Sequence, residues 1–80
     1  MRREQEVLIN RIETLCKEKE LTLYKLSYRS AVPMTTLMHI MDGTTVNPGI
    51  FTIIKLCEGL EMPVSEFFAT KEFDDLLKEM

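Results

Sequence analysis

This chain of 80 residues has few of the histidines and cysteines that serve as nucleophiles, bases or zinc ligands. There is one histidine, His39, and there are two cysteines, Cys16 and Cys57. These three lack the spacing of a zinc finger, and the sequence contains no phosphate-binding glycine loop. Helical periodicity turns both cysteines inward and His39 outward, which opposes a catalytic Cys-His pair. We therefore expect no enzyme activity, no metal site and no cofactor.

The distribution of charge indicates a different chemistry, the binding of anions. The chain has 10 Lys and Arg against 13 Asp and Glu, a net charge of −3. Residues 66–80 hold five acids against two lysines, so this tail accounts for the whole excess and residues 1–65 are neutral. Residues 21–57 carry one carboxylate, Asp42, against three cations, which are Lys25, Arg29 and Lys55. This central segment is the candidate anion-facing region.

Length and composition set the class of protein. A chain of 80 residues buries about 60% of its unfolded surface in a single domain, which is enough for a core without disulfides. Its 45% hydrophobic and 29% charged residues are typical of a globular domain. No apolar run reaches the ~18 residues of a membrane span, and no signal-peptide core follows Met1. We expect a cytoplasmic protein with reduced cysteines and no membrane partner.

Apolar periodicity predicts an all-α fold of five or six short helices without strands. An amphipathic helix is expected over about residues 3–19, since apolar side chains recur at helical spacing at Val7, Leu8, Ile12 and Leu15. Thr22 can accept a hydrogen bond from a first-turn amide, which predicts a second, short helix over about residues 23–29.

The third predicted helix completes a helix, turn, helix arrangement. Pro33 fixes φ just before a helix over about residues 34–42, and Gly43 ends it in a left-handed conformation. Leu37 and Ile40 are its inward positions.

The fourth predicted helix, residues 49–60, should be the centre of the core. It has the broadest apolar face in the chain, predicted from Ile50, Ile53, Ile54, Cys57 and Leu60. A face this wide must be buried. Pro63 ends this region, a short turn or helix follows over residues 64–68, and Thr70 can cap a last helix.

These features occur together in one known family. The shared segments are Leu21 to Leu26, Val32 to Leu37, Ile40, Gly43, Asn47 to Ile50, Thr52, Ile53, Lys55, Leu60 and Glu66 to Phe68. Over about residues 7–68 the chain resembles the XRE family of helix-turn-helix proteins, the group of lambda repressor and Cro. The resemblance implies a compact five-helix, lambda-repressor-like DNA-binding domain over residues 1–69. Residues 70–80 would add a short C-terminal helix.

The resemblance also implies which residues contact DNA. The second helix of the motif lies in the major groove, and the first crosses the phosphate backbone. The implied base contacts are Met34, Thr35, Thr36, Met38 and His39, whose hydroxyl, methyl and imidazole groups suit base edges. The expected phosphate contacts are Thr22, Lys25, Arg29, Thr44, Thr45, Asn47 and Lys55.

The function implied is sequence-specific transcriptional regulation of bacterial or phage type, with repression favoured and double-stranded operator DNA as partner. No small-molecule substrate is expected. Leu23 stands where the family usually has glutamine, and Asp42 where a basic or amide residue is common. These departures leave an alternative open: a protein-interaction module of the same fold, serving as an antirepressor, antitoxin or assembly partner. Ala31 and Glu61 replace glycines that are usual at two turns, which predicts strained or altered turns.

The last predicted helix carries an apolar stripe at i, i+3, i+4 and i+7, formed by Phe73, Leu76, Leu77 and Met80. Such a stripe must pack on something. It either folds back on the first helix or pairs with a second subunit around a two-fold axis. Two recognition helices about 34 Å apart would meet successive major grooves, so DNA binding favours the homodimer.

Overall fold

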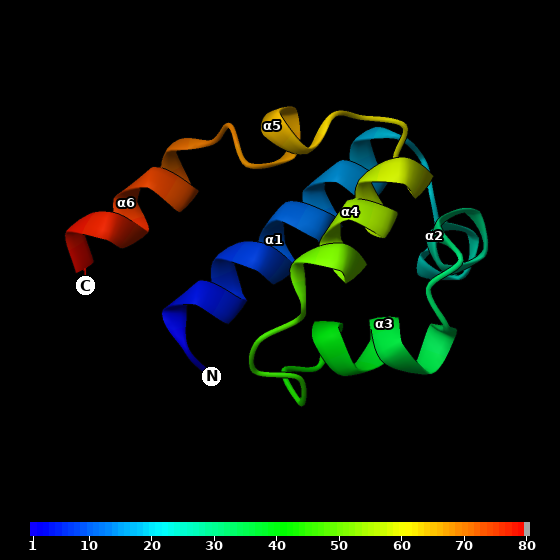
Figure 1. Cartoon of the computed structure of the whole chain (residues 1–80), viewed down its shortest axis with the longest axis horizontal. Helices are drawn as coiled ribbons and strands as arrows, with labels where there is room; N and C mark the ends of the chain where they lie inside the picture. The colour runs from blue at the N-terminus through cyan, green and yellow to red at the C-terminus, as the bar shows by residue number, and fades with distance from the viewer. Residues whose placement is uncertain (80) are drawn as a thin grey trace.

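The computed structural model describes residues 1–79, and its elements there are six helices without a strand, which confirms the predicted all-α class. The helices are α1 (Arg3–Glu18), α2 (Leu23–Ser30), α3 (Met34–Met41), α4 (Ile50–Gly59), α5 (Val64–Phe67) and α6 (Lys71–Glu79). Figure 1 shows α2 and α6 at opposite ends of the molecule and α3 along one edge. The chain measures 35 × 25 × 21 Å.

The helix ends follow local signals in the sequence. The Thr22 hydroxyl accepts a hydrogen bond from the Lys25 amide at 3.1 Å, so the predicted cap of α2 is confirmed. Gly43 adopts the predicted left-handed conformation after α3, with φ of 85°. The predicted bounds of the first four helices agree with the structure to within one residue at each end.

Three turns place a residue other than glycine in the left-handed region. Glu20, Ala31 and Glu61 have φ of 55°, 56° and 55°, each just after a helix. The positions of Ala31 and Glu61 were the two where a glycine was expected. The turns keep the conformation that glycine favours, and the strain, about 1 to 2 kcal/mol per residue, falls on residues with a Cβ atom.

The core contains residues from all of the first five helices. Its fully buried members include Ile12, Leu26, Leu37, Leu56 and Phe67, and both cysteines are buried beside them. Burial raises the pKa of the Cys16 and Cys57 thiols, although the positive charge of Arg11 acts in the opposite direction on Cys57.

The predicted inward face of α4 is partly wrong. Ile53, Cys57 and Leu60 are buried, but Ile50 and Ile54 are exposed and Leu56 is buried instead. Because α4 packs against α2 and α5, the buried face centres on Leu56. The helix is apolar on almost every side, so periodicity alone could not select the buried one.

Arg11 links α1 to α5 through side-chain hydrogen bonds. Its Nε donates to the Phe67 carbonyl at 2.7 Å and its Nη2 to the Glu66 carbonyl at 2.9 Å, and its guanidinium lies 5.9 Å from the centre of the Phe67 ring. Both carbonyls lie at the end of α5, and the Glu66 carbonyl also accepts from the Ala69 amide at 3.2 Å.

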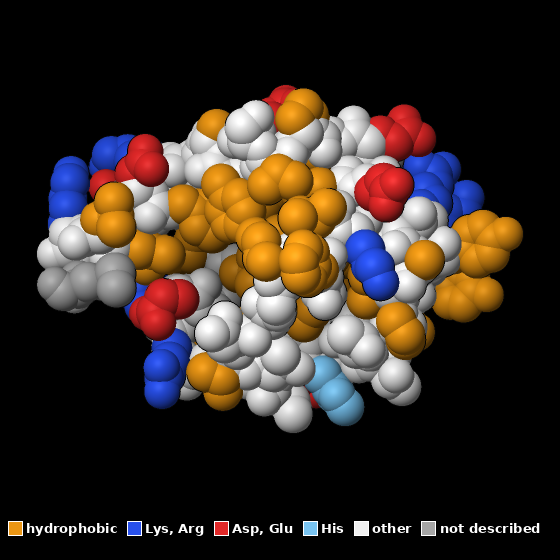
Figure 2. Space-filling view, in the orientation of Figure 1, with side chains coloured by type: hydrophobic (Ala, Val, Ile, Leu, Met, Phe, Trp, Pro, Cys, Tyr) orange, Lys and Arg blue, Asp and Glu red, His pale blue; other side chains and the backbone are white. Residues whose placement is uncertain are grey.

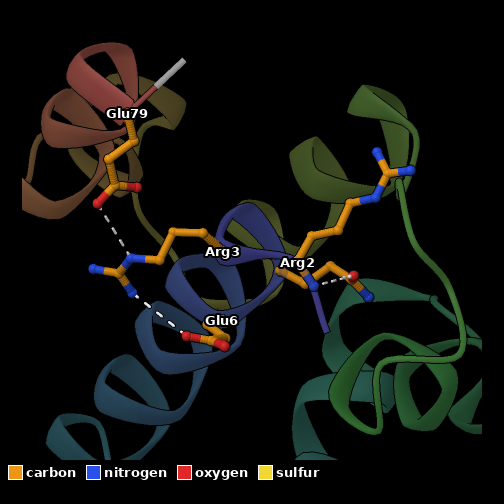
Figure 3. Close-up of polar contacts among 5 residues, drawn as sticks. Arg2, Arg3, Glu6 and Glu79 are labelled. Carbon is orange, nitrogen blue, oxygen red and sulfur yellow. Dashed lines mark hydrogen bonds and ion pairs between the residues drawn. The ribbon is translucent and has the colours of Figure 1, made fainter.

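The terminal helix α6 folds back against α1. Phe73 packs on Phe68 with ring centres 4.9 Å apart and on Phe67 at 6.1 Å. Figure 3 shows Arg3 of α1 between two carboxylates, 3.7 Å from Glu6 of the same helix and 3.5 Å from Glu79 of α6. Phe73 therefore packs within its own chain, as in the alternative in which the last helix folds back on the first.

Within residues 1–79, every helix is too short or too polar to cross a lipid bilayer.

Candidate nucleic-acid interface

The candidate interface consists of α2 and α3, which are joined by the turn at residues 31–33. Leu26 and Ser30 of α2 are buried, as are the predicted inward residues Leu37 and Ile40 of α3. The Ser30 hydroxyl donates to the Leu26 carbonyl at 2.6 Å, which satisfies this buried polar group within its own helix. With these side chains fixed in the core, the opposite face of α3 must point to solvent.

The five predicted base-contact residues all lie on α3. Thr35, Met38 and His39 are exposed, whereas Met34 and Thr36 are half-buried. None of the eight residues of α3 carries a carboxylate. The exposed face thus offers a hydroxyl, a thioether and an imidazole, groups that suit the edges of bases in a major groove.

The predicted phosphate contacts lie on α2 and its cap, in the loop after α3 and on α4. Lys25, Arg29 and Lys55 are exposed, and none of the three makes an ion pair with another described residue. Their charge therefore remains available to an external anion. Thr22, Thr44 and Asn47 are also exposed, whereas Thr45 is half-buried.

The loop between α3 and α4 is held by Gln5, a residue that sequence reasoning missed. The Gln5 amide is buried, donates to the Gly43 carbonyl at 2.9 Å and to the Thr45 carbonyl at 3.4 Å, and accepts from the Arg2 amide at 3.0 Å. Figure 3 includes this last contact at the start of α1. A polar residue near a helix N-terminus normally lies in solvent, so no sequence signal distinguished Gln5.

Asp42 places a negative charge at the end of α3. Its carboxylate accepts a hydrogen bond from the Thr44 amide at 2.8 Å. Hydrogen bonding from Thr44 lowers the pKa of Asp42, and the nearby His39 acts in the same direction. Asp42 is therefore ionised at neutral pH and stabilises the turn that leads into the loop.

Sequence reasoning also missed two tyrosines on α2. Tyr24 and Tyr28 are exposed, and together with Lys25 and Arg29 they line a shallow surface hollow of about 370 Å³. The two tyrosines are four residues apart, and so are Lys25 and Arg29, so each pair lies on one side of the helix. This spacing was the signal that could have identified the cluster. Phenolic hydroxyls beside cations are suitable donors to phosphate oxygens.

The four residues predicted for a dimer interface have different surroundings. Phe73 is half-buried in the aromatic cluster, and Leu76 is half-buried along a groove beside α4. Leu77 is exposed. Met80 lies outside the described residues.

No cluster of three His, Cys, Asp or Glu side chains that could hold a metal ion is present in residues 1–79. The two cysteines are buried and His39 is exposed, as their helical positions predicted.

Comparison of the chain with protein-family models, with curated proteins and with solved structures found no match.

Proposed function

We propose that this chain is a cytoplasmic, non-catalytic DNA-binding regulator of the XRE helix-turn-helix type, acting as a homodimer, with repression as the favoured outcome. The observation that carries the proposal is the exposed face of α3. It bears Thr35, Met38 and His39 and contains no carboxylate. The cations on α2 and α4 form no ion pair within residues 1–79.

In this proposal α3 enters the major groove of an operator. The Thr35 hydroxyl and the His39 imidazole hydrogen-bond to base edges, and the Met38 methyl group contacts thymine methyls. Met34 and Thr36 contribute at the edge of the face. The first-turn amides of α2, next to the Thr22 cap, and the cations Lys25, Arg29 and Lys55 contact phosphates. Gln5 holds the loop that carries Thr44, Thr45 and Asn47 in place.

The first test is the salt dependence of binding. We expect fluorescence anisotropy with duplex DNA to give an affinity that falls steeply with salt concentration. Each of K25Q, R29Q and K55Q should lower the slope of log affinity against log salt by about one, because each removes one phosphate contact. Lys78→Gln is the matched control, since Lys78 lies on α6 at the other end of the molecule (Figure 1) and pairs with Asp75. Slopes unchanged in all three variants would contradict the proposed phosphate-binding surface.

The second test concerns base contacts. A duplex selected by the protein from a random library serves as the specific site, and a scrambled duplex serves as the reference. We expect T35A and H39A each to weaken binding to the selected duplex at least about tenfold, and to change binding to the scrambled duplex little. Equal losses on both duplexes would remove the claim of specific recognition. No enrichment of any sequence, together with no salt slope, would favour the protein-interaction alternative.

A further inference from the structure

Apolar side chains are exposed on α4 and in the loop that precedes it. There are four of them, and we call them the α4 patch: Val46 at 50% exposure, Ile50 at 54%, Phe51 at 78% and Ile54 at 41%. The patch borders a groove of about 330 Å³ whose walls include Leu8, Phe68, Phe73 and Leu76. Figure 2 shows apolar side chains gathered in one area over α4 and toward α6. The largest apolar patch on a protein surface is often functional.

The area of the patch fits one side of a protein interface. At roughly 150–200 Å² of surface for a large apolar side chain, the four residues expose about 400 Å². A standard interface buries about 800 Å² on each partner, and somewhat more than half of that area is apolar. The α4 patch therefore supplies nearly all the apolar area that one partner contributes.

The low charge of the patch favours a second copy of this chain as the partner. Residues 43–54 contain no charged side chain, and the patch is flanked by Lys55, one turn after Phe51, and by Glu4 on the groove. Around a two-fold axis each side chain lies close to its own copy, so any charge there would face a like charge and repel it. A neutral patch avoids this repulsion, and it offers no charge by which to recognise an acidic or basic partner.

The position of the patch agrees with binding of two copies to DNA. When two subunits present α3 to one side of a duplex, the two-fold axis passes between the two α3 helices, and surfaces that face this axis can make the contact. The α4 patch begins in the loop that leaves α3 and continues directly into α4. This step rests on the proposed function, whereas the exposure, area and neutrality of the patch do not.

We infer that two copies of this chain associate through the α4 patch, with Phe51 as the central contact. The interface differs from the α6 stripe predicted from the sequence. Phe73 and Leu76 of that stripe are already half-buried within the chain. Only Leu77 is comparably open, at 75% exposure.

Sedimentation equilibrium of the full chain between 1 and 100 µM, without DNA, tests the inference. We expect a monomer-dimer equilibrium in the micromolar range. Phe51→Asp places a negative charge on the patch of each copy and should weaken association at least tenfold. Leu77→Asp adds the same charge at an equally exposed site on α6, so it is the matched control and should leave the equilibrium unchanged. Circular dichroism and thermal unfolding of both variants establish that each remains folded, and Ile54→Asp provides a second variant in the patch.

Three outcomes would overturn the inference. They are an unaltered chain that stays monomeric at 100 µM, association unchanged in both patch variants, and association lost in L77D but kept in F51D. The last outcome would assign the interface to α6. Because these measurements contain no DNA, a dimer that binds no DNA would contradict the proposed function alone. A monomer that binds its selected duplex would contradict the inference and the homodimer of the proposed function, and would leave the proposed DNA binding intact.

Discussion

Ile53→Ala should lower the free energy of unfolding by about 2 to 5 kcal/mol, because the cavity left in a packed core adds to the lost hydrophobic burial. Ile53 is 4% exposed and packs in the core cluster. A loss of this size is a large fraction of the stability of a domain of this length, about 4 to 12 kcal/mol. Urea unfolding followed by circular dichroism measures it, and a full baseline at low urea shows whether the variant still folds.

The neighbouring residue provides the matched control. Ile54 has the same side chain on the same helix, but it is 41% exposed. We expect Ile54→Ala to cost less than about 1 kcal/mol, since surface substitutions outside special contacts have small effects. Equal losses at the two positions would mean that the buried face of α4 is not the one described.

Gly59→Ala should destabilise the protein by about 2 to 3 kcal/mol through overpacking. Gly59 is buried where α4 meets α2, and a Cβ atom there would lie 2.8 Å from the Ser30 Cβ and 2.9 Å from the Ser30 backbone nitrogen. Because one of these atoms belongs to the backbone, no side-chain rotation relieves the contact, and the two helices must separate. Thermal unfolding should show a lower midpoint, and we expect weaker DNA binding because α2 positions α3.

Gly49→Ala is the control for this substitution. Gly49 precedes α4, has φ of −66°, and a Cβ atom there would meet no atom within 4 Å. We expect a change of less than about 1 kcal/mol, of the size that separates Gly from Ala at a helix N-cap. A Gly59→Ala variant as stable as the Gly49→Ala variant would show that α2 and α4 approach less closely than described.

The sequence by itself determined the features that depend on neighbouring residues. Thr22 caps α2 and Gly43 ends α3 because each acts on amides or torsions within a few residues of itself. The orientation of α3 was also predictable. Leu37 and Ile40 are apolar and at helical spacing, so they turn inward, which leaves Met38 and His39 on the outer side. The DNA-contact candidates follow from that orientation. Their use in binding DNA stays a prediction.

Only the tertiary structure decided which apolar surfaces are buried. α4 is apolar on several sides, and α2 and α5 cover one of them, so Leu56 is enclosed while Ile50, Phe51 and Ile54 face solvent. The roles of Gln5 and Arg11 depend on carbonyls 38 to 56 residues away in sequence. Periodicity describes one helix at a time, whereas these contacts depend on where other helices lie. For the same reason Phe73 belongs to an aromatic cluster that no local pattern predicts.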